Sequence, residues 1–273
     1  MKGLTIYKMT GSGNDFVFLD ARVSSPKDWS AVAIQAVCAR GTGVGADGIV
    51  FVGPGSAPGA ARMIYYNSDG SHAAMCGNAA LCSTRLAAHL GLAPEAQMTL
   101  ETDAGVYQSR CAGPGERAQL HLAPVAAPRE VPGLGLAAGE RRAALGTVGV
   151  PHLVVLMDDV DRVDLAVRGR ALRFDPALAP AGANINFISP GPDAGFWRMR
   201  TYERGVESET LACGTGAVTA GCALASWGLA KLPLAVVTRS GLELGIQARL
   251  AGTAYDDVWL EGEARLVFRG VLT

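Results

Sequence analysis

Two short segments of this 273-residue chain are near copies of one another. One runs from Met75 to Ala80 as MCGNAA, and the other runs from Ala212 to Ala217 as ACGTGA. Each follows a stretch with strand and turn character and leads into a strongly helical stretch. Because such a duplication requires two similarly folded halves, it constrains the fold more than any other feature of the sequence.

Further landmarks recur around the two copies in the same order. They are a strand-like run (61–67 and 196–203) and a Thr-x-x-Gly turn (102–105 and 238–241). Upstream, the segment Asn14–Phe16 is interpreted as the counterpart of Asn184–Phe187. The ordered recurrence predicts two pseudo-symmetric domains rather than a chance match.

The composition of the chain locates the boundary between the two halves. Turn-forming Gly and Pro residues are frequent after residue 112, where the halves are expected to join. We predict an N-terminal half over residues 1–118 and a C-terminal half over 119–262, with the last strand, 263–273, returning to the N-terminal half. Short strand-like runs with few helices predict an α+β fold with mainly antiparallel sheet.

The helical stretches after the two copies are unusually apolar. Residues 217–230 carry no charged side chain, and 79–90 carry only Arg85 and His89 as ionisable groups. A helix without a polar face is buried on all sides. The sequence therefore predicts, in each half, a curved sheet or barrel wrapped around one central helix.

A cysteine stands just before each of these helices. The unpaired N–H groups and the dipole at a helix N-terminus favour the thiolate form. We predict Asn78 and Thr215 as N-caps, with Cys76 and Cys213 just ahead of the first turn. Two equivalent thiols can take a proton from one face of a carbon and return one to the other, as in a cofactor-independent racemase. Backbone N–H groups that could hold the substrate carboxylate belong to Gly77, Asn78, Gly214 and Thr215.

Each of these residues also has a purely structural interpretation. Cys76 and Cys213 could be buried fillers at tight turns, but their duplicated context favours chemistry. His152 and Glu203 are candidate proton partners of the thiols, although a lone histidine is more often structural and Glu203 could form a solvated ion pair. The helical Cys38, Cys82 and Cys222 are interpreted as small buried apolar residues.

Charge and motif content exclude several classes of protein. A net charge of −1 attracts neither nucleic acid nor an anionic membrane surface. The chain lacks an apolar run long enough for a membrane span, a signal-peptide core, Cys-x-x-Cys pairs and a metal-ligand cluster, so a cytoplasmic protein without bound metal is expected. The segment 43–48 matches G-x-G-x-x-G, but it lies between a helix and a strand instead of following a strand, so no dinucleotide site is expected. No other cofactor is expected.

Several ordered motifs resemble the diaminopimelate epimerase family along essentially the whole chain. They are GSGNDF (11–16), GVGADG (43–48), YNSDG (66–70), CGN (76–78), PH (151–152), NINF (184–187), YERG (202–205) and ETLACGTG (209–216). The resemblance implies an isomerase that interconverts LL- and meso-diaminopimelate for lysine and cell-wall synthesis. It also implies no cofactor, a homodimer and an active site between two pseudo-symmetric domains.

The resemblance also implies roles for individual residues. Cys76 and Cys213 correspond to the acid/base pair, and His152 and Glu203 to their proton partners. The residues expected to hold the distal end of the substrate are Asn14, Asn67, Asn184 and Arg204. Amide and guanidinium donors suit a distal carboxylate, which agrees with this assignment.

Departures from the family pattern bear on the substrate. Val150 stands before Pro151-His152, where an asparagine is frequent in the family. A racemase of the same fold acting on another amino acid is therefore an alternative. A non-catalytic amino-acid-binding or thiol-redox protein is a second alternative, which would bind substrate without exchanging its Cα proton.

Overall fold

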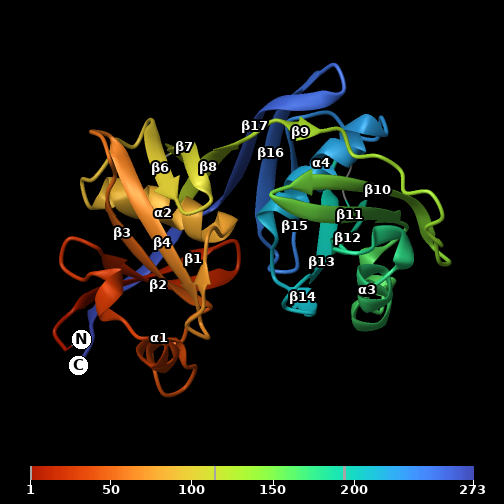
Figure 1. Cartoon of the computed structure of the whole chain (residues 1–273). Helices are drawn as coiled ribbons and strands as arrows, with labels where there is room; N and C mark the ends of the chain where they lie inside the picture. Colours follow the sequence, from red (N-terminus) through yellow and green to blue (C-terminus); the bar gives the residue numbers. More distant parts are fainter. Residues whose placement is uncertain (1, 114, 193–194) are drawn as a thin grey trace. The chain divides into compact units, whose positions relative to one another are not determined.

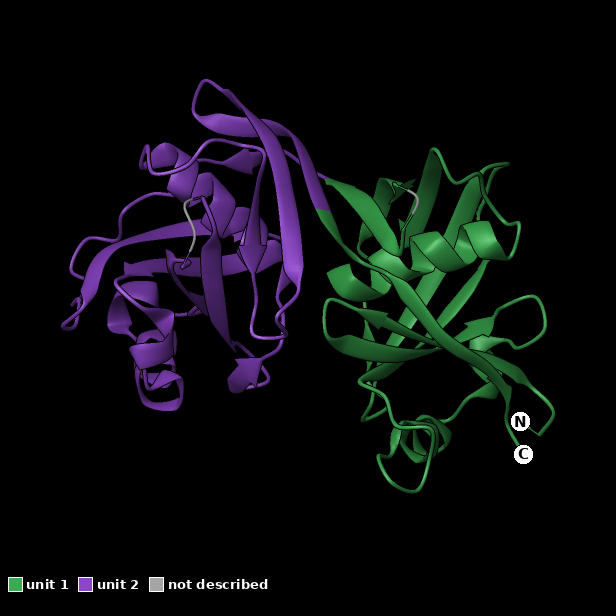
Figure 2. Cartoon of the chain, turned by 180° about the vertical axis from the view of Figure 1, so that it is seen from behind, with its two compact units in different colours: residues 1–121, 261–273 green, residues 122–260 purple. Residues whose placement is uncertain are grey.

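A computed structural model of the chain describes residues 2–113, 115–192 and 195–273. The chain folds into two compact units (Figure 2), one made of residues 1–121 with 261–273 and the other of residues 122–260. The first unit is therefore built from both ends of this sequence, and the second unit is inserted into it.

The first unit consists of a sheet, a peripheral helix and a central helix (Figure 1). Its strands are β1 (Thr5–Gly11), β2 (Asn14–Asp20), β3 (Gly48–Pro54), β4 (Ala60–Asn67), β5 (His72–Ala73), β6 (Met98–Thr102), β7 (Gly105–Ala112), β8 (Arg117–Leu122) and β18 (Arg265–Val271). Its helices are η1 (Pro26–Asp28), α1 (Ala31–Cys38) and α2 (Gly77–His89).

The second unit repeats this arrangement. Its strands are β9 (Val125–Ala126), β10 (Glu140–Val148), β11 (Val150–Met157), β12 (Asn184–Pro190), β13 (Trp197–Glu203), β14 (Ser208–Thr210), β15 (Leu234–Val237), β16 (Glu243–Ala251) and most of β17 (Ala254–Glu263). Its helices are η2 (Val160–Arg162), α3 (Leu165–Arg173), η3 (Pro176–Leu178) and α4 (Gly214–Ser226).

The strand pairings match between the two units. In the first, β1–β2 is antiparallel, β2–β3 parallel, β3–β4 antiparallel and β4–β6 parallel. In the second, β10–β11 is antiparallel, β11–β12 parallel, β12–β13 antiparallel and β13–β15 parallel. The prediction of an α+β fold with two pseudo-symmetric domains is confirmed.

Strand register shows which residues correspond. Phe16 of β2 lies opposite Gly48 of β3, and His152 of β11 lies opposite Asn184 of β12. Phe16 therefore corresponds to His152, and Gly48 corresponds to Asn184. By the same register, two residues earlier, the position of Asn14 corresponds to that of Val150.

The predicted counterpart of Asn14–Phe16 is thus wrong. Asn184–Phe187 begins the third strand of its unit, whereas Asn14–Phe16 begins the second strand of the first unit. Both segments carry an asparagine at the start of a buried strand. This similarity in sequence alone suggested a correspondence that the strand order does not support.

Side chains alternate between the two faces of each sheet, and both faces are covered. One face of the second unit forms an apolar cluster that includes Leu153, Ile185 and Tyr202, and α3 packs against β12 and β13. The opposite face lies against α4, which contacts β10, β11 and β12. Gly146 permits this contact, since a Cβ there would lie 2.8 Å from Cγ2 of Thr219 on α4.

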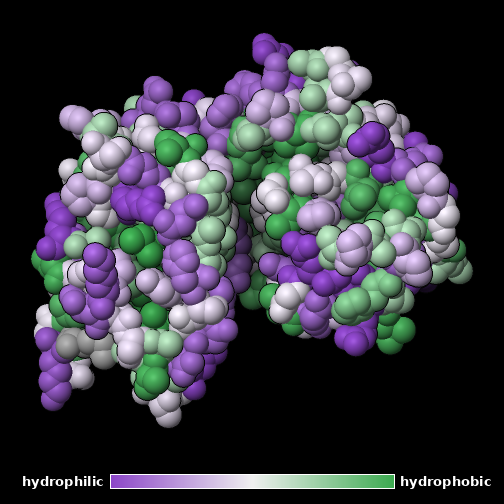
Figure 3. Space-filling view, in the orientation of Figure 1, coloured by the Kyte–Doolittle hydropathy of each residue, from purple (hydrophilic) through white to green (hydrophobic). Residues whose placement is uncertain are grey.

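The outer surface is mixed in character. Hydrophilic and hydrophobic side chains are interspersed over both units in the view of Figure 3. Among the described residues, no helix is both long enough and apolar enough to cross a membrane.

Candidate active site

Cys76 and Cys213 are themselves the N-caps of α2 and α4. Both have extended backbone angles, with φ −139° and ψ 122° at Cys76 and φ −132° and ψ 106° at Cys213. The Cys76 carbonyl accepts the first helical hydrogen bond from Ala80 N, and the Cys213 carbonyl accepts one from Ala217 N, both at 2.9 Å. Each cysteine therefore lies beside the N–H groups of a first helical turn, where negative charge is favoured.

The prediction that Asn78 and Thr215 cap the helices is wrong by two residues. Both occupy the second position inside the first turn, after a glycine. Neither cysteine side chain forms a capping hydrogen bond. Both helices can begin at the cysteine because its carbonyl, rather than a side chain two residues later, starts the hydrogen-bond pattern.

Thr215 instead contacts the thiol. Its Oγ1 lies 3.7 Å from Cys213 Sγ, within hydrogen-bond distance for sulfur. Cys213 is buried, with 8% of its surface exposed, whereas Cys76 is half-buried. Either atom can be the donor in this contact, and a hydroxyl that donates to the sulfur favours its thiolate form.

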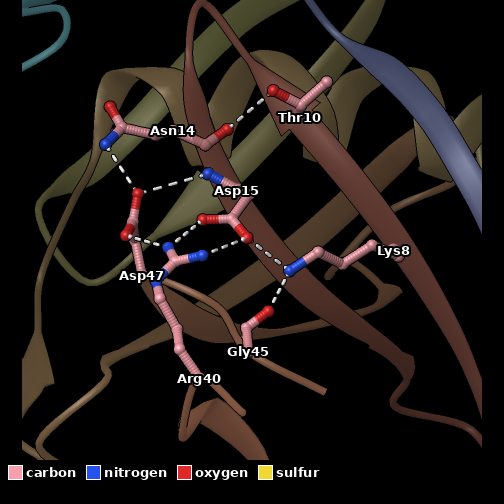
Figure 4. Close-up of polar contacts among 7 residues, drawn as sticks. All are labelled: Lys8, Thr10, Asn14, Asp15, Arg40, Gly45 and Asp47. Atoms are coloured by element: carbon pink, nitrogen blue, oxygen red, sulfur yellow. Dashed lines mark hydrogen bonds and ion pairs between the residues drawn. The ribbon is translucent and has the colours of Figure 1, made fainter.

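The asparagine side chains of the first unit form a connected group near the start of α2. Asn78 Nδ2 donates to Asn14 Oδ1 at 2.7 Å, and Asn14 Nδ2 donates to Asp47 Oδ2 at 2.9 Å. The amide of Asn14 is therefore held at both ends (Figure 4 draws its contact with Asp47). The structure brings Asn14 and Asn78 together, as required if both contact one substrate.

A charged cluster supports Asp47 (Figure 4). Arg40 donates to Asp47 Oδ1 at 2.8 Å and to Asp15 Oδ1 at 2.5 Å. Lys8 donates to Asp15 Oδ2 at 2.5 Å and also to the carbonyl of Gly45. Burial alone would raise the pKa of Asp15, but the hydrogen bonds from Arg40 and Lys8 outweigh it and lower that pKa. Asp47 was not predicted as a site residue, although it lies in the GVGADG motif.

Asn67 lies at the end of β4, opposite Gly48. Its Nδ2 donates to Ser71 Oγ at 3.0 Å, and its backbone N donates to the Ser71 carbonyl at 2.9 Å. The next residue, Ser68, donates its backbone N–H to the Asp47 carbonyl at 3.0 Å. The turn that carries Asn67 is therefore tied to the loop that orients Asn14.

His152 lies near the start of β11 and is fully buried. Burial, aided by the positive charge of Arg204, lowers the pKa of His152 to about 3. The imidazole is therefore neutral at physiological pH. Its Nδ1 lies 3.3 Å from Asn186 Nδ2, and its Nε2 is buried with no hydrogen-bond partner among the described residues.

Three predicted residues meet at the junction of β12 and β13. Asn184 Oδ1 accepts the backbone N–H of Arg204 at 2.7 Å. Glu203, the last residue of β13, is half-buried, and this burial raises its pKa even though a hydrogen bond with Thr210 opposes the shift. A carboxyl group with a raised pKa suits proton transfer near neutrality.

Three of the four remaining thiols are in a different environment. Burial raises the pKa of Cys38 to about 11 and that of Cys222 to about 12. Burial, and then the nearby Cys76 and Glu263, raises the pKa of Cys82 well above its usual value. These three cysteines are buried neutral thiols, which agrees with their interpretation as packing residues.

Sequence reasoning missed Asn186 and Thr201. Asn186 occurs in the NINF motif, but only Asn184 was given a role. Residues two apart on a strand face the same side, so Asn186 lies on the same face as Asn184. That periodicity would have identified it if the buried face of the strand had been known.

Comparisons with known proteins agree with one another. The family model described as diaminopimelate epimerase matches residues 6–125 and 145–265. A diaminopimelate epimerase of Gemmatimonas aurantiaca is 45% identical over 98% of both chains, and that of Aquifex aeolicus is 38% identical over 99% of this chain and 98% of its own.

Solved structures share the fold at low identity. A PhzF-family phenazine biosynthesis protein of Bacillus anthracis aligns over 100% of both chains, with a TM-score of 0.75 and 16% identity. A hydroxyproline epimerase of Agrobacterium vitis covers 100% of this chain and 91% of its own, with a TM-score of 0.66 and 17% identity.

Proposed function

The chain belongs to the diaminopimelate epimerase family, and from this premise we propose that it interconverts LL- and meso-diaminopimelate. The enzyme is an isomerase, and its reaction supplies precursors of lysine and peptidoglycan. The observation that carries the proposal is the repeated placement of a cysteine as the N-cap of a buried central helix.

The proposed chemistry uses the two thiols alone and needs no cofactor. The thiolate of one cysteine takes the Cα proton and becomes a thiol, which leaves the electron pair on the substrate. The thiol of the other cysteine then gives its proton to the opposite face of Cα and becomes a thiolate. The reverse reaction exchanges the roles of Cys76 and Cys213.

The electron pair left on Cα needs electrostatic stabilisation. We propose that the α-carboxylate accepts hydrogen bonds from the first turns of α2 and α4, where backbone N–H groups lack helical partners. These groups belong to Gly77, Asn78, Gly214 and Thr215. His152 and Glu203 are proposed as the proton partners of the thiols, and the neutral state of His152 makes it a hydrogen-bonding partner rather than a cation.

The distal end of the substrate is proposed to contact four polar residues. The Asn14–Asp47 bond at 2.9 Å and the Asn184–Arg204 bond at 2.7 Å support this role, because side chains already held in place lose little conformational freedom on binding. The proposed residues are Asn14, Asn67, Asn184 and Arg204.

One residue favours a different substrate as a second candidate function. Val150 is half-buried and corresponds by register to Asn14, so the second unit offers no amide at that position. A racemase for an amino acid with a different distal group would fit this change. Binding without any exchange of the Cα proton would instead indicate the non-catalytic or thiol-redox alternative.

We further propose a cytoplasmic homodimer that binds a small molecule and no nucleic acid. The net charge of −1 supports the absence of nucleic-acid binding. The exposed Leu266, Val267 and Phe268 of β18 support self-association, because their apolar surface would be covered by a second copy. Sedimentation of the wild type and of Phe268→Lys tests this part of the proposal, and a monomeric wild type contradicts it.

Incubation of reduced protein with LL-diaminopimelate in deuterated buffer tests the main proposal. Deuterium at Cα together with the meso isomer is the expected result. Folded, reduced protein that gives neither product would overturn the assignment of substrate. A screen of other amino acids for Cα exchange under the same conditions then distinguishes the two candidate functions.

A further inference from the structure

Asn186 lies where the sheet of the second unit meets the central helix. It is fully buried on β12, and its side chain lies on the face of the sheet that packs against α4. A Cβ added to Gly216, in the first turn of α4, would lie 2.2 Å from Asn186 Oδ1 and 3.3 Å from Cys213 Sγ. The amide oxygen and the thiol sulfur therefore both approach the same backbone position.

The hydrogen bonds of Asn186 fix the orientation of its amide. Thr201 Oγ1, directly across the strand pair, donates to Asn186 Oδ1 at 3.0 Å. Asn186 Nδ2 then faces the carbonyl of Leu153 at 3.3 Å and that of Asn184 at 3.5 Å. Carbonyl oxygens accept hydrogen bonds and cannot donate them, so the NH₂ group must be on this side.

This orientation determines the protonation of the His152 ring. Nδ1 of His152 lies 3.3 Å from the Asn186 NH₂ group, so it must be the unprotonated, accepting nitrogen. In a neutral ring the proton is then on Nε2. That nitrogen is buried and has no acceptor among the described residues, so its N–H is free to donate to an anionic group of a bound substrate or to a thiolate.

The first unit shows that the fold does not require this polar cluster. By strand register, Val50 corresponds to Asn186, Tyr65 to Thr201, and Phe16 to His152. Phe16 and Tyr65 form an edge-to-face aromatic contact, with ring centroids 6.0 Å apart. The same architecture is thus built once with an apolar cluster and once with buried polar groups, whose burial is costly unless they are hydrogen-bonded.

We propose that Asn186 is a positioning residue that holds His152 as the Nε2–H tautomer and packs against the helix turn that carries Cys213. The contribution to catalysis rests on the proposed function, since it requires that His152 contacts the reacting groups. The tautomer itself does not depend on that function and can be measured separately.

Asn186→Asp is the most informative variant. It keeps the size of the side chain and its acceptor for Thr201, but it replaces the NH₂ donor by an acceptor. His152 is then expected to carry its proton on Nδ1, so Nε2 changes from donor to acceptor. Nitrogen-15 NMR of the histidine rings reports the protonated nitrogen, and His152→Gln assigns the signal among the four histidines of the chain. We expect kcat for Cα exchange to fall by roughly 100-fold or more, with a smaller change in KM.

Thr201→Val is a second, milder variant in case Asn186→Asp does not fold. It preserves the shape of the side chain but removes the hydroxyl that orients the amide, so a mixture of His152 tautomers and an intermediate kcat are expected. Val154→Ala is the matched control. It shortens a buried side chain opposite Asn186 in the β11–β12 register, so it should lower stability but leave the tautomer and kcat unchanged.

Three results would overturn the inference. They are a wild-type His152 protonated on Nδ1, a tautomer that Asn186→Asp does not change, and a kcat that falls equally in Val154→Ala. A wild type that holds the Nε2–H tautomer but exchanges no Cα proton would confirm the positioning of the ring and contradict the proposed function instead.

Discussion

The sheet faces beneath the two central helices have the same topology but opposite chemistry. In the first unit, β2, β3 and β4 contribute Phe16, Val50 and Tyr65 to this face. In the second unit, the corresponding positions on β11, β12 and β13 are His152, Asn186 and Thr201, which are all buried. The repeated backbone therefore supports two helix N-termini in different surroundings.

This difference shows that one repeated fold can carry different groups of side chains beneath its two central helices. In the proposed mechanism the two cysteines need equivalent backbone positions, because each would act as acid in one direction and as base in the other. Groups that bind one particular substrate need no such symmetry. In the first unit the polar groups lie near the start of α2, around Asn14 and Asp47. In the second unit they also occupy the sheet face that packs against α4.

Removing either thiol is the strongest test of the equivalence. Cys76→Ala and Cys213→Ala should each lower kcat for epimerisation by roughly 10²–10⁴-fold or more, since each removes one of the two proton-transfer groups. Cys111→Ala is the control, with activity unchanged. Deuterium exchange measures the activity of each variant, and thermal melts on the same samples show whether it is folded. Full activity in either variant would disprove the two-thiol mechanism.

The buried histidine should make the second unit sensitive to acid. Because the pKa of His152 is about 3 in the folded protein in place of its ordinary 6.5, the unfolded chain binds a proton first as pH falls. His152 therefore lowers the free energy of unfolding by up to about 1.4 kcal/mol per pH unit as pH falls from 6.5 toward 3.

Urea titrations at several pH values measure this dependence. His152→Gln removes the titrating group and should flatten it, whereas Phe16 offers no such group at the corresponding position. An unchanged pH dependence in His152→Gln would show that His152 is not buried in its neutral form.

The first helical turns offer a comparison already present in the chain. Gly216 is the third residue of α4, and the third residue of α2 is Ala79. A Cβ is accommodated at Ala79, but at Gly216 it would lie 2.2 Å from Asn186 Oδ1. Gly216→Ala should therefore cost about 1–3 kcal/mol of stability.

Asn186→Val introduces the residue that the first unit has at the corresponding position, Val50. Combining it with Gly216→Ala identifies the cause of the lost stability. The double variant should cost less than the sum of the two single changes, because the shorter side chain removes the close contact. Strict additivity in chemical denaturation would show that the two residues do not clash.

A substitution at Asp47 tests the role of the polar group around Asn14 in the first unit. Asp47→Ala leaves Asn14 Nδ2 without its 2.9 Å acceptor, so the amide is no longer fixed. We expect KM for the substrate to rise by roughly 10-fold, with a smaller change in kcat, since a hydrogen bond to a charged group contributes about 1.5–3 kcal/mol. Lys2→Ala, an exposed lysine outside this cluster, is the control. An unchanged KM would show that the orientation of Asn14 does not contribute to substrate binding.

Val150→Asn is expected to have the smallest effect. It would give the second unit the amide that Asn14 provides at the corresponding position of the first. If the substrate is diaminopimelate, KM should fall a few-fold, in line with about 0.5–1.5 kcal/mol for one added hydrogen bond. A rise in KM would favour a substrate with a different distal group.

The sequence predicted the features that depend on local pattern. The repeated Cys-Gly motifs, the uncharged segment 217–230 and the short strand runs were sufficient for the fold class. Strand register was beyond such patterns, so Asn14 was matched to Asn184 instead of Val150. The roles of Asn186 and Asp47 depend on contacts with Thr201 and Arg40 that only the folded chain brings together.

The pairing of β1 with β18 has a consequence for protein synthesis. These strands join Thr5 to Val271, near opposite ends of the sequence. During translation all strands of the second unit are made before β18, so β1, already paired with β2, has to wait for its second neighbour. The first unit, although its synthesis begins first, is completed last, because its sheet lacks β18 until residues 265–271 have left the ribosome.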